Sequence, residues 1–247
     1  MSPQALEDKA SAVHAMFEAL AVRYDLVNDV LSLGIHRSWR QEATHEVFAD
    51  DISVDDIRVE AAKRILDVAT GTADVAIELK QHCPSAEVVG VDFSEAMLTV
   101  GRHKIAGKGL DIVLEQGDGL NLAYPDNSFD VITVAYGFRN FANYPRGLAE
   151  FARVLKPAGK LVMLDFPPPP EGLLGRMFRL YCLQIAPLLG GLITGHLSAY
   201  AYLGKSALAF PKPADLAQMM LEAGFASVRY RLQSFGVSAI HVATLPA

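Results

Sequence analysis

The stretch Ile65-Leu-Asp-Val-Ala-Thr-Gly-Thr-Ala-Asp74 has the residue types and order of a cofactor-binding turn. An apolar run ends in Asp67, small residues follow, and a second apolar run ends in Asp92. Small residues let backbone N–H groups approach a ligand closely, and an acid at the end of the second strand accepts hydrogen bonds from ribose hydroxyls. The pattern predicts a nucleotide-type cofactor site at the edge of a parallel sheet.

The turn itself reads Asp67-x-Ala69-x-Gly71-x-Ala73, and not the Gly-x-Gly-x-x-Gly of dinucleotide sites. It resembles the Asp/Glu-x-Gly-x-Gly-x-Gly turn of S-adenosylmethionine methyltransferases, with alanine in place of two glycines. A dinucleotide must place a pyrophosphate over the turn, whereas S-adenosylmethionine has no phosphate. An acid entering the turn and slightly bulkier alanines are therefore tolerable, and the resemblance implies S-adenosylmethionine as the cofactor.

Alternating apolar and helical patterns predict the elements that must carry this site. Because strands alternate with helices, the pattern favours a parallel sheet covered by helices on both faces. The predicted strands are Ile65–Ala69, Val88–Asp92, Ile112–Gln116, Val131–Ala135 and Leu161–Phe166. The predicted helices between them are Val75–His82, Ser94–Lys104 and Arg146–Leu155.

The two ends of the chain complete this prediction. Residues 10–48 are predicted to be helical, because their apolar residues recur at the spacing of one helix face. The other predicted features are an acidic loop over Asp50–Asp56, a turn at Lys156–Gly159, a polyproline-like Pro167–Pro170, a helix over Pro213–Ala223, and an antiparallel edge hairpin of Val228–Leu232 and Ser238–Val242.

Length and charge narrow the class of protein. The 247 residues are enough for one large α/β domain. With 22 basic and 28 acidic residues the net charge is −6, which argues against a nucleic-acid partner. Cys83 and Cys182 make no zinc pattern and the histidines show no metal spacing, so no metal is expected. The first residues show no apolar signal region, and these features favour a cytoplasmic protein.

The segment Leu173–Leu197 is unusually apolar, although polar and small residues interrupt it. The uninterrupted pieces are too short for a membrane span of roughly twenty residues. We therefore expect a buried helical hairpin or a lid over an apolar ligand. Arg176 and Arg179 stand at one end, where they could meet lipid headgroups in a transient, peripheral membrane contact.

Beyond the cofactor turn, the chain resembles the ubiquinone/menaquinone biosynthesis C-methyltransferase family over nearly its whole length. The most specific matches are Arg23-Tyr-Asp-Leu-Val-Asn28 and Tyr136-Gly-Phe-Arg-Asn140. Further matches are 31–40, 92–97, 125–130, 153–157, 199–203 and 239–241. Three places depart from the family pattern: Asp165-Phe-Pro-Pro-Pro-Pro170 replaces Glu-Phe-Ser-Lys-Pro, Ser234-Phe-Gly236 replaces Thr-Gly-Gly, and Ala135 replaces a serine.

The resemblance implies the α/β, Rossmann-like fold of class I S-adenosylmethionine methyltransferases. Its parts would be a mostly parallel seven-stranded sheet with an antiparallel edge hairpin, N-terminal helices and an apolar helical insert. A single domain, 1–247, would then comprise an N-terminal substrate cap (1–60), a cofactor-binding core (61–166), the insert (167–212), and a C-terminal helix with the edge hairpin (213–247).

The implied reaction is S-adenosylmethionine-dependent C-methylation of a polyprenylated quinol, foremost demethylmenaquinol to menaquinol. Two other readings stay open: an O- or N-methyltransferase for another apolar small molecule, and a methyltransferase-like scaffold subunit without turnover. The quinone nucleus, the tail length and a homodimer also stay open.

The resemblance also assigns residues to the site. The cofactor would contact Asp67, Thr70, Gly71, Thr72, Asp92, Phe93, Met97, Asp118, Gly119 and Ala135. The substrate would contact Asn28, Tyr200 and Tyr202, and the catalytic candidates are Arg139, Asn140, Tyr24, Asp25 and His241. Some have ordinary alternatives: Asp92 as a helix cap, Asp118 as a loop acid, Arg139 as an exposed loop charge, and His241 as a core histidine.

The expected chemistry needs no metal, because the sulfonium methyl is already activated and the enzyme must only align an in-line displacement. The ring carbon becomes nucleophilic once the neighbouring hydroxyl loses its proton. Arg139 cannot be the base, because a guanidinium stays protonated, but it can stabilise the phenolate. The base is left open between water, Tyr24, Asp25 and His241.

Overall fold

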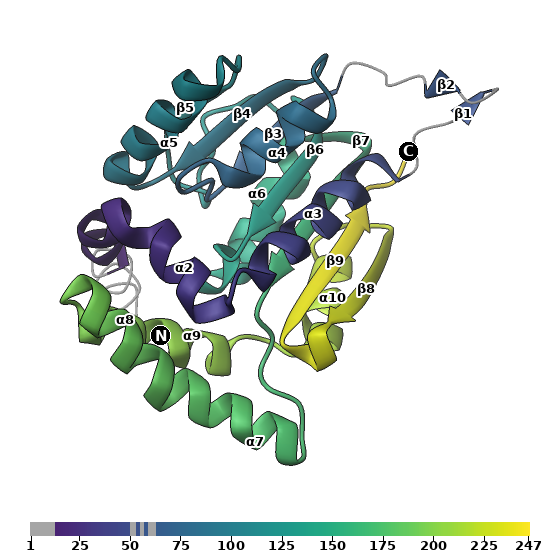
Figure 1. The fold of residues 1–247 in the computed structure, drawn as a ribbon. Coiled ribbons are helices and arrows are strands. Elements are labelled where there is room, and N and C mark those ends of the chain that lie inside the picture. The colour runs from purple at the N-terminus through teal and green to yellow at the C-terminus, as the bar shows by residue number, and fades with distance from the viewer. Residues whose placement is uncertain (1–12, 50–52, 55–56, 59–62) are drawn as a thin grey trace.

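The computed structural model describes residues 13–49, 53–54, 57–58 and 63–247 (Figure 1). Its main sheet has the strand order β5-β4-β3-β6-β7-β9-β8. The strands are β3 Arg64–Val68, β4 Glu87–Asp92, β5 Val113–Gln116, β6 Phe129–Ala135, β7 Leu155–Asp165, β8 Ser227–Gln233 and β9 Ser238–Thr244. The first five run parallel, while β9 pairs antiparallel with β7 and β8. The predicted fold, with its antiparallel edge hairpin, is confirmed.

Helices cover both faces of the sheet, which explains why the inner strands are almost continuously apolar. The helices are α2 Tyr24–Ser32, α3 Ile35–Phe48, α4 Asp74–His82, α5 Glu95–Lys108, α6 Tyr144–Val154 and α10 Pro213–Glu222. Residues from α3, α4 and α5 form a core with one face, and residues from α6 and α10 form a core with the other. The helical residues 13–20, with η1 Ala21–Arg23, lead into α2.

Two predicted turns differ from the structure. Residues 156–159 lie inside β7, where the pairing with β6 jumps from Phe129 opposite Leu155 to Val131 opposite Lys160. The buried Leu155 already pairs with β6 before residues 156–159 begin, and the pairing resumes at Lys160. The four residues therefore form an irregularity within one strand and not a turn before it. In the predicted acidic loop 50–56, residues 53–54 form the short strand β1 (Ser53–Val54) paired with β2 (Ile57–Arg58). The rest of that loop lies outside the described residues.

The apolar insert is a helical hairpin, but it is not buried. One continuous helix runs through α7 (Leu173–Leu180), the π-helical turn η3 (Tyr181–Ile185) and α8 (Ala186–Thr194), and α9 (Leu197–Ala209) returns along it. This 22-residue helix is long and apolar enough, by length and composition, to cross a membrane. The predicted helical hairpin is therefore confirmed, but its predicted burial is wrong, and the glycines that interrupt the apolar pattern do not end the helix.

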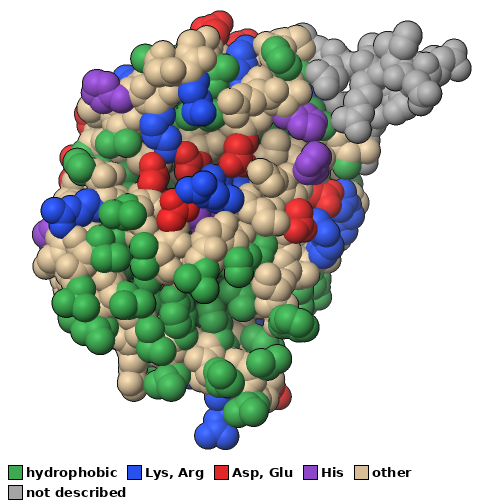
Figure 2. Space-filling view, in the orientation of Figure 1, with side chains coloured by type: hydrophobic (Ala, Val, Ile, Leu, Met, Phe, Trp, Pro, Cys, Tyr) green, Lys and Arg blue, Asp and Glu red, His purple; other side chains and the backbone are tan. Residues whose placement is uncertain are grey.

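Small residues let this helix pack closely against α9 on one side. A Cβ on Gly190 would lie 2.4 Å from the Tyr200 ring of α9, so the close approach of α8 and α9 requires glycine there. The opposite side of the helix is exposed, with Leu192 75% accessible. Figure 2 shows hydrophobic side chains gathered over α2, α7 and α8.

Candidate functional site

Two neighbouring cavities lie at the carboxyl ends of the parallel strands, where open α/β sheets bind ligands. The larger, about 430 Å³, is bounded by the ends of β3, β4 and β6 and by residues from 13–24. The smaller, about 160 Å³, lies between α2, α3 and the insert. Because Tyr24 and Tyr136 line both cavities, the two spaces meet at these rings.

The turn after β3 lines the larger cavity with its backbone. Ala69, Gly71 and Ala73 have left-handed φ angles of 54°, 56° and 66°. For a residue with a side chain this conformation costs roughly 1–2 kcal/mol, which explains why glycine is usual in such turns. The Ala69 methyl has room because a Cβ on Gly137 would lie only 2.4 Å from it. Gly137 thus accommodates the Ala69 replacement.

Asp92 ends β4 and faces the larger cavity beside that turn. Its Oδ2 accepts from the Gly71 N–H at 2.8 Å and its Oδ1 from the Ser94 N–H at 2.9 Å. Ser94, and not Asp92, is the residue that caps α5, so the helix-cap alternative does not describe Asp92. Burial raises the pKa of Asp92 to about 6. A carboxylate in this position suits acceptance of ribose hydroxyls.

Asp67 and Thr70 lie beneath the turn and bond to each other. The Thr70 hydroxyl donates to Asp67 Oδ2 at 2.6 Å, and the Thr133 hydroxyl donates to Asp67 Oδ1 at 2.6 Å. Burial raises the pKa of Asp67 to about 6. Both carboxylate oxygens are therefore used within the protein. These bonds shape the turn from beneath, and the cofactor contacts of Asp67 and Thr70 stay predictions.

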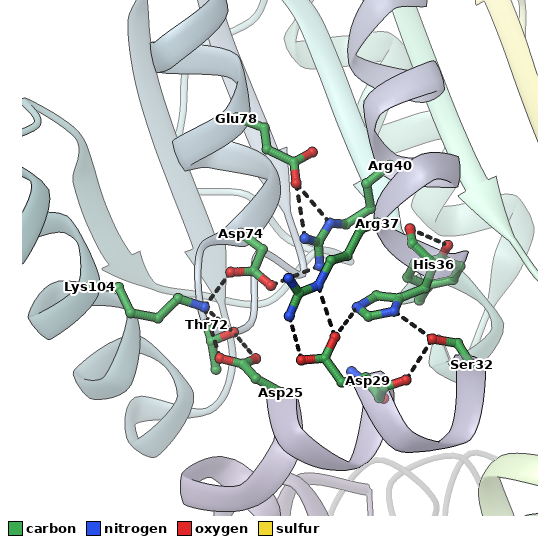
Figure 3. A network of polar contacts seen from close by, with 12 residues as sticks. Asp25, Asp29, Ser32, His36, Arg37, Arg40, Thr72, Asp74, Glu78 and Lys104 are labelled. Atoms are coloured by element: carbon green, nitrogen blue, oxygen red, sulfur yellow. Dashed lines mark hydrogen bonds and ion pairs between the residues drawn. The ribbon is translucent and has the colours of Figure 1, made fainter. Parts of the chain in front are cut away.

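Thr72 and Asp25 meet on the outer side of the turn (Figure 3). The Thr72 hydroxyl donates to Asp25 Oδ1 at 2.7 Å, and Lys104 Nζ donates to Asp25 Oδ2 at 2.9 Å. Lys104 also pairs with Asp74, which accepts from Arg40 at 2.7 Å. Neither Thr72 nor Asp25 is among the described residues that line the two cavities. These bonds tie α2 to the turn, and the roles of Thr72 as cofactor ligand and of Asp25 as base stay predictions.

The remaining predicted cofactor residues Phe93, Met97, Asp118, Gly119 and Ala135 all line the larger cavity. Gly119 leaves necessary space, since a Cβ there would lie 2.5 Å from the Phe141 ring. Helical residues Val13, His14 and Phe17 close the same cavity, and the sequence prediction missed this role. The apolar face of residues 13–20 was visible in the sequence, but nothing in that pattern said what it covers.

Asn140 supplies an unsatisfied acceptor to the larger cavity. Its Oδ1 is buried without a hydrogen-bond partner among the described residues, although the residue lines the cavity. Buried polar atoms normally have a partner. A ligand with an N–H or O–H donor at this point would satisfy the atom, and S-adenosylmethionine carries such donors in its amino groups and ribose.

The smaller cavity collects four predicted residues around an apolar space. Asn28, Arg139 and Tyr200 line it together with the shared Tyr24. The sequence prediction missed Ser32, His36, Trp39 and Phe166 on the same wall. The motif around 31–40 could have signalled them, because it holds polar and aromatic residues at helical spacing.

Arg139 is buried, and not an exposed loop charge. Its Nη1 donates to Asp165 Oδ1 at 2.9 Å and to the Tyr136 carbonyl at 2.7 Å, while its backbone N–H donates to Asp165 Oδ2 at 3.0 Å. The guanidinium also lies 5.3 Å from the Phe166 ring centroid. Asp165 therefore holds the cation in place. The departure from glutamate to aspartate at Asp165 keeps that carboxylate.

Two predicted residues lie elsewhere. His241 is buried in β9, with its Nε2 3.0 Å from the Pro213 carbonyl and its ring stacked on Tyr230. It is not among the described residues lining either cavity, so the core-histidine alternative fits its surroundings, and its catalytic role stays a prediction. Tyr202, predicted to contact the substrate together with Tyr200, lies in a separate groove between residues 13–19 and α9, while Tyr200 lines the smaller cavity.

Solved structures with a similar fold include S-adenosylmethionine methyltransferases. A methyltransferase of Thermotoga maritima, described as a possible histamine N-methyltransferase, superposes with a TM-score of 0.63 over 94% of this chain and 99% of that one, at 18% identity. Phosphoethanolamine N-methyltransferase 2 of Haemonchus contortus, solved with S-adenosylmethionine, gives 0.59 over 84% of this chain and 57% of its own, at 13% identity. At such low identity these similarities show the fold alone.

Sequence relatives are much closer. A demethylmenaquinone methyltransferase of Deinococcus radiodurans is 51% identical over 96% of this chain and 93% of its own length. That of Thermus thermophilus is 49% identical over 94% of this chain and 100% of its own length. The model of the ubiE/COQ5 methyltransferase family matches residues 4–245. With this match and these relatives, the chain belongs to the ubiE/COQ5 methyltransferase family.

Proposed function

We propose that this chain transfers a methyl group from S-adenosylmethionine to a ring carbon of a polyprenyl quinol, foremost demethylmenaquinol. The observation that carries the proposal is the pair of cavities that meet at Tyr24 and Tyr136. One holds the cofactor turn with Asp92, and the other is apolar with the Arg139 cation on its wall. The names of the two demethylmenaquinone methyltransferase relatives support the same reaction.

The larger cavity fits the cofactor by size and chemistry. Its volume of about 430 Å³ is within the range of small-molecule sites. Asp92 would accept from the ribose, and Asn140 would accept from a donor on the cofactor. When bound, S-adenosylmethionine supplies an activated methyl group, so the protein contributes alignment and control of charge on the quinol.

The Arg139 guanidinium supplies that control of charge. It is buried and oriented by Asp165, so it need not reorganise when negative charge develops on the quinol oxygen. A fixed donor of this kind contributes about a hundred- to a thousandfold in kcat in other enzymes. We assign Arg139 to the phenolate oxygen, and Tyr24 and Asn28 to the position of the ring.

We assign the described part of 1–60 and the insert 167–212 as the two walls of the substrate space. Tyr181 of the insert hydrogen-bonds to the Leu31 carbonyl, and Arg23 hydrogen-bonds to the Ile193 carbonyl. These bonds fasten the insert to α2. Residues 61–166 then form the cofactor core, and 213–247 the outer part of the sheet.

The insert also presents an exposed apolar face, which we define as Val22, Leu26, Leu33, Leu173, Leu174, Met177, Leu180, Leu188 and Leu192. A polyprenyl tail partitions into lipid, so the enzyme must meet its substrate at a bilayer surface. We propose that this face touches the inner surface of the membrane during catalysis. The net charge of −6 makes the contact apolar and local, and not a general attraction to anionic lipid.

Product analysis tests the reaction. The protein is incubated with methyl-labelled S-adenosylmethionine and, in parallel, with demethylmenaquinol and a polyprenyl methoxybenzoquinol. A new carbon–methyl bond on the first substrate supports the proposal. A methyl ether or amine product would establish the O- or N-methyltransferase instead. Cofactor binding in calorimetry without turnover on any substrate would establish the scaffold reading.

Vesicle flotation tests the membrane contact. The protein is mixed with neutral phosphatidylcholine vesicles with and without the quinol, and the floated fraction is measured beside sedimentation of the free protein. Binding to neutral vesicles supports the proposal. A dimer in solution that does not float would assign the apolar face to a second copy of this chain.

A further inference from the structure

The phenolic proton of the quinol needs an acceptor, and the smaller cavity restricts the choice. The described titratable residues on its wall, besides Arg139, are Tyr24, His36, Tyr136, Tyr181, Cys182 and Tyr200. Burial raises the pKa of all four tyrosines, that of Tyr200 to about 12, and raises the pKa of Cys182 to about 11. Phenols and a thiol whose pKa is raised above its usual range stay protonated at neutral pH. His36 is therefore the side chain on this wall that can take up a proton.

Ser32 connects His36 to the cavity. Its Oγ lies 2.6 Å from His36 Nδ1 and 2.7 Å from the Asn28 carbonyl, so its single proton can be donated to either acceptor. Both Ser32 and His36 line the smaller cavity. The two residues come from the end of α2 and the start of α3, which the left-handed Leu33 and Gly34 join tightly.

A polar route leads from His36 to solvent (Figure 3). Its Nε2 lies 3.8 Å from Asp29 Oδ1, and Arg37 Nε donates to the same oxygen at 2.9 Å. The Arg37 side chain is 61% exposed and that of Asp29 33%. One edge of the imidazole thus faces the substrate cavity through Ser32, and the other faces a charged pair at the surface.

We propose that Ser32 and His36 form the proton relay for the quinol hydroxyl, a role that rests on the proposed function. The quinol O–H bond breaks and its proton passes to Ser32 Oγ, while the Ser32 hydroxyl proton passes to His36 Nδ1. The electron pair stays on the quinol oxygen, where Arg139 stabilises it. The imidazolium then loses a proton past Asp29 to solvent. Ser32 regains its proton in the transfer, and the imidazole is left with its proton on Nδ1. Exchange with solvent must return the ring to the Nε2–H tautomer before the next turnover.

The surroundings keep His36 neutral before the reaction. Burial lowers its pKa from the usual range of histidine, and Arg40 and Arg37 lower it further, while Asp29 from α2 and Asp74 from α4 oppose them. Tyr136, which follows β6, places its hydroxyl oxygen 3.5 Å from the His36 carbonyl oxygen. A neutral imidazole is the state that a proton acceptor needs, and its activity is lost as pH falls through this lowered pKa.

The other candidates for the base do not fit as well. Asp25 is committed to Thr72 and Lys104, and Asp165 to Arg139. His14 lines the larger cavity beside Phe93, on the cofactor side. His36 alone combines access to the smaller cavity with an exit to solvent among these residues.

The test uses His36→Gln, which can still hydrogen-bond to Ser32 but cannot take up a proton. At saturating cofactor and quinol we expect kcat to fall by about a hundredfold or more, with the KM values nearly unchanged. The acidic limb of the kcat–pH profile should disappear in the variant. His45→Gln, an exposed residue on the same helix, is the matched control and should keep the wild-type profile.

Two further measurements keep the result decisive. Nitrogen-15 NMR of labelled histidines should show the His36 ring neutral at pH 7 and shifted when a short-tailed quinol binds. If His36→Gln does not fold, Ser32→Ala removes the same relay, and it should lose turnover with unchanged cofactor affinity.

The outcomes separate the relay from the proposed function. The relay alone would be overturned if the wild type turns over demethylmenaquinol and His36→Gln keeps full kcat and an unaltered pH profile. Where His36→Gln does not fold, the same result in Ser32→Ala would overturn it. Lack of any quinol turnover by the wild type would overturn the proposed function, and the relay with it.

Discussion

The two cavities are built in different ways. The larger is formed mainly by the chain around three strand ends, with a turn whose backbone is set by residues 69–73. The smaller is formed by side chains from α2, α3, η2 (Phe138–Asn140) and the insert, which are far apart in the sequence. If the proposed function holds, cofactor affinity and quinol turnover should depend largely on separate residues outside the shared Tyr24 and Tyr136. Single substitutions should then affect one and spare the other.

The largest effect is expected at Arg139. Arg139→Ala removes a fixed cation, so kcat should fall by about a hundred- to a thousandfold with cofactor affinity nearly intact. Raising the pH should rescue part of the rate, because the phenolate then forms without help. Steady-state kinetics and calorimetry measure both. Since the substitution leaves Asp165 buried and unpaired, Arg139→Ala with Asp165→Asn is the control for lost stability. If cofactor binding and turnover were lost together, Arg139 would instead be a residue of the cofactor site in the larger cavity.

Asp92 should show the opposite pattern. Asp92→Ala should weaken S-adenosylmethionine binding by about ten- to a hundredfold, the value of roughly 1.5–3 kcal/mol for hydrogen bonds to a charged group. Calorimetry on the folded variant measures it. Asp118→Ala, on the same cavity wall, serves as a comparison. Unchanged affinity in the Asp92 variant would remove this residue from cofactor binding.

The raised pKa of Asp92 adds a pH dependence. The carboxylate predominates above about pH 6 and is protonated below it, so cofactor affinity should decline as the pH falls through this value, and Asp92→Asn should abolish the decline. Stability has the opposite sign. A raised carboxyl pKa favours the folded state at low pH, and this contribution is lost as the pH rises through about 6. Melting curves of wild type and Asp92→Asn over this range separate the two effects.

A smaller, structural effect is expected from Gly137 and Ala69. A Cβ at Gly137 would meet the Ala69 Cβ at 2.4 Å, so Gly137→Ala should lower the free energy of unfolding by about 1–3 kcal/mol. Ala69→Gly should restore most of it, with a coupling energy of roughly 0.5–3 kcal/mol between neighbours. Denaturant unfolding of the two single variants and the double variant gives this coupling. Strictly additive changes would show that the two sites do not touch.

The smallest effect on stability is expected at the apolar face. Leu188→Glu with Leu192→Glu places charges at residues that are 54% and 75% exposed, so the free energy of unfolding should change by only about 0.5 kcal/mol per site. Turnover of a long-tailed quinol in vesicles should fall, while turnover of a short-tailed analogue stays. Equal loss on both substrates with a lowered Tm would show that the face belongs to the core.

The cofactor half of the site follows from local sequence, and the substrate half does not. Apolar runs that end in Asp67 and Asp92 predicted the strands and the edge that carries them. The same local pattern could not tell that Asp67 points beneath the turn to Thr133, because this depends on the neighbouring strand. Asp25 and Thr72 fell in recognisable motifs, but their hydrogen bond and the Lys104 pair join α2, the turn and α5.

The sequence by itself determined the order of strands and helices, the position of the cofactor turn and the family resemblance. These features depend on periodicity and on short motifs, and both are formed by residues close together in the sequence. Only the tertiary structure decided that Arg139 is held by Asp165 and that His241 lies in the core. It also decided that His36 and Ser32 face the smaller cavity, and that the insert exposes its apolar side. The physical reason is that burial and pairing depend on which distant elements pack together, and a side chain's charge state and partners follow from that packing.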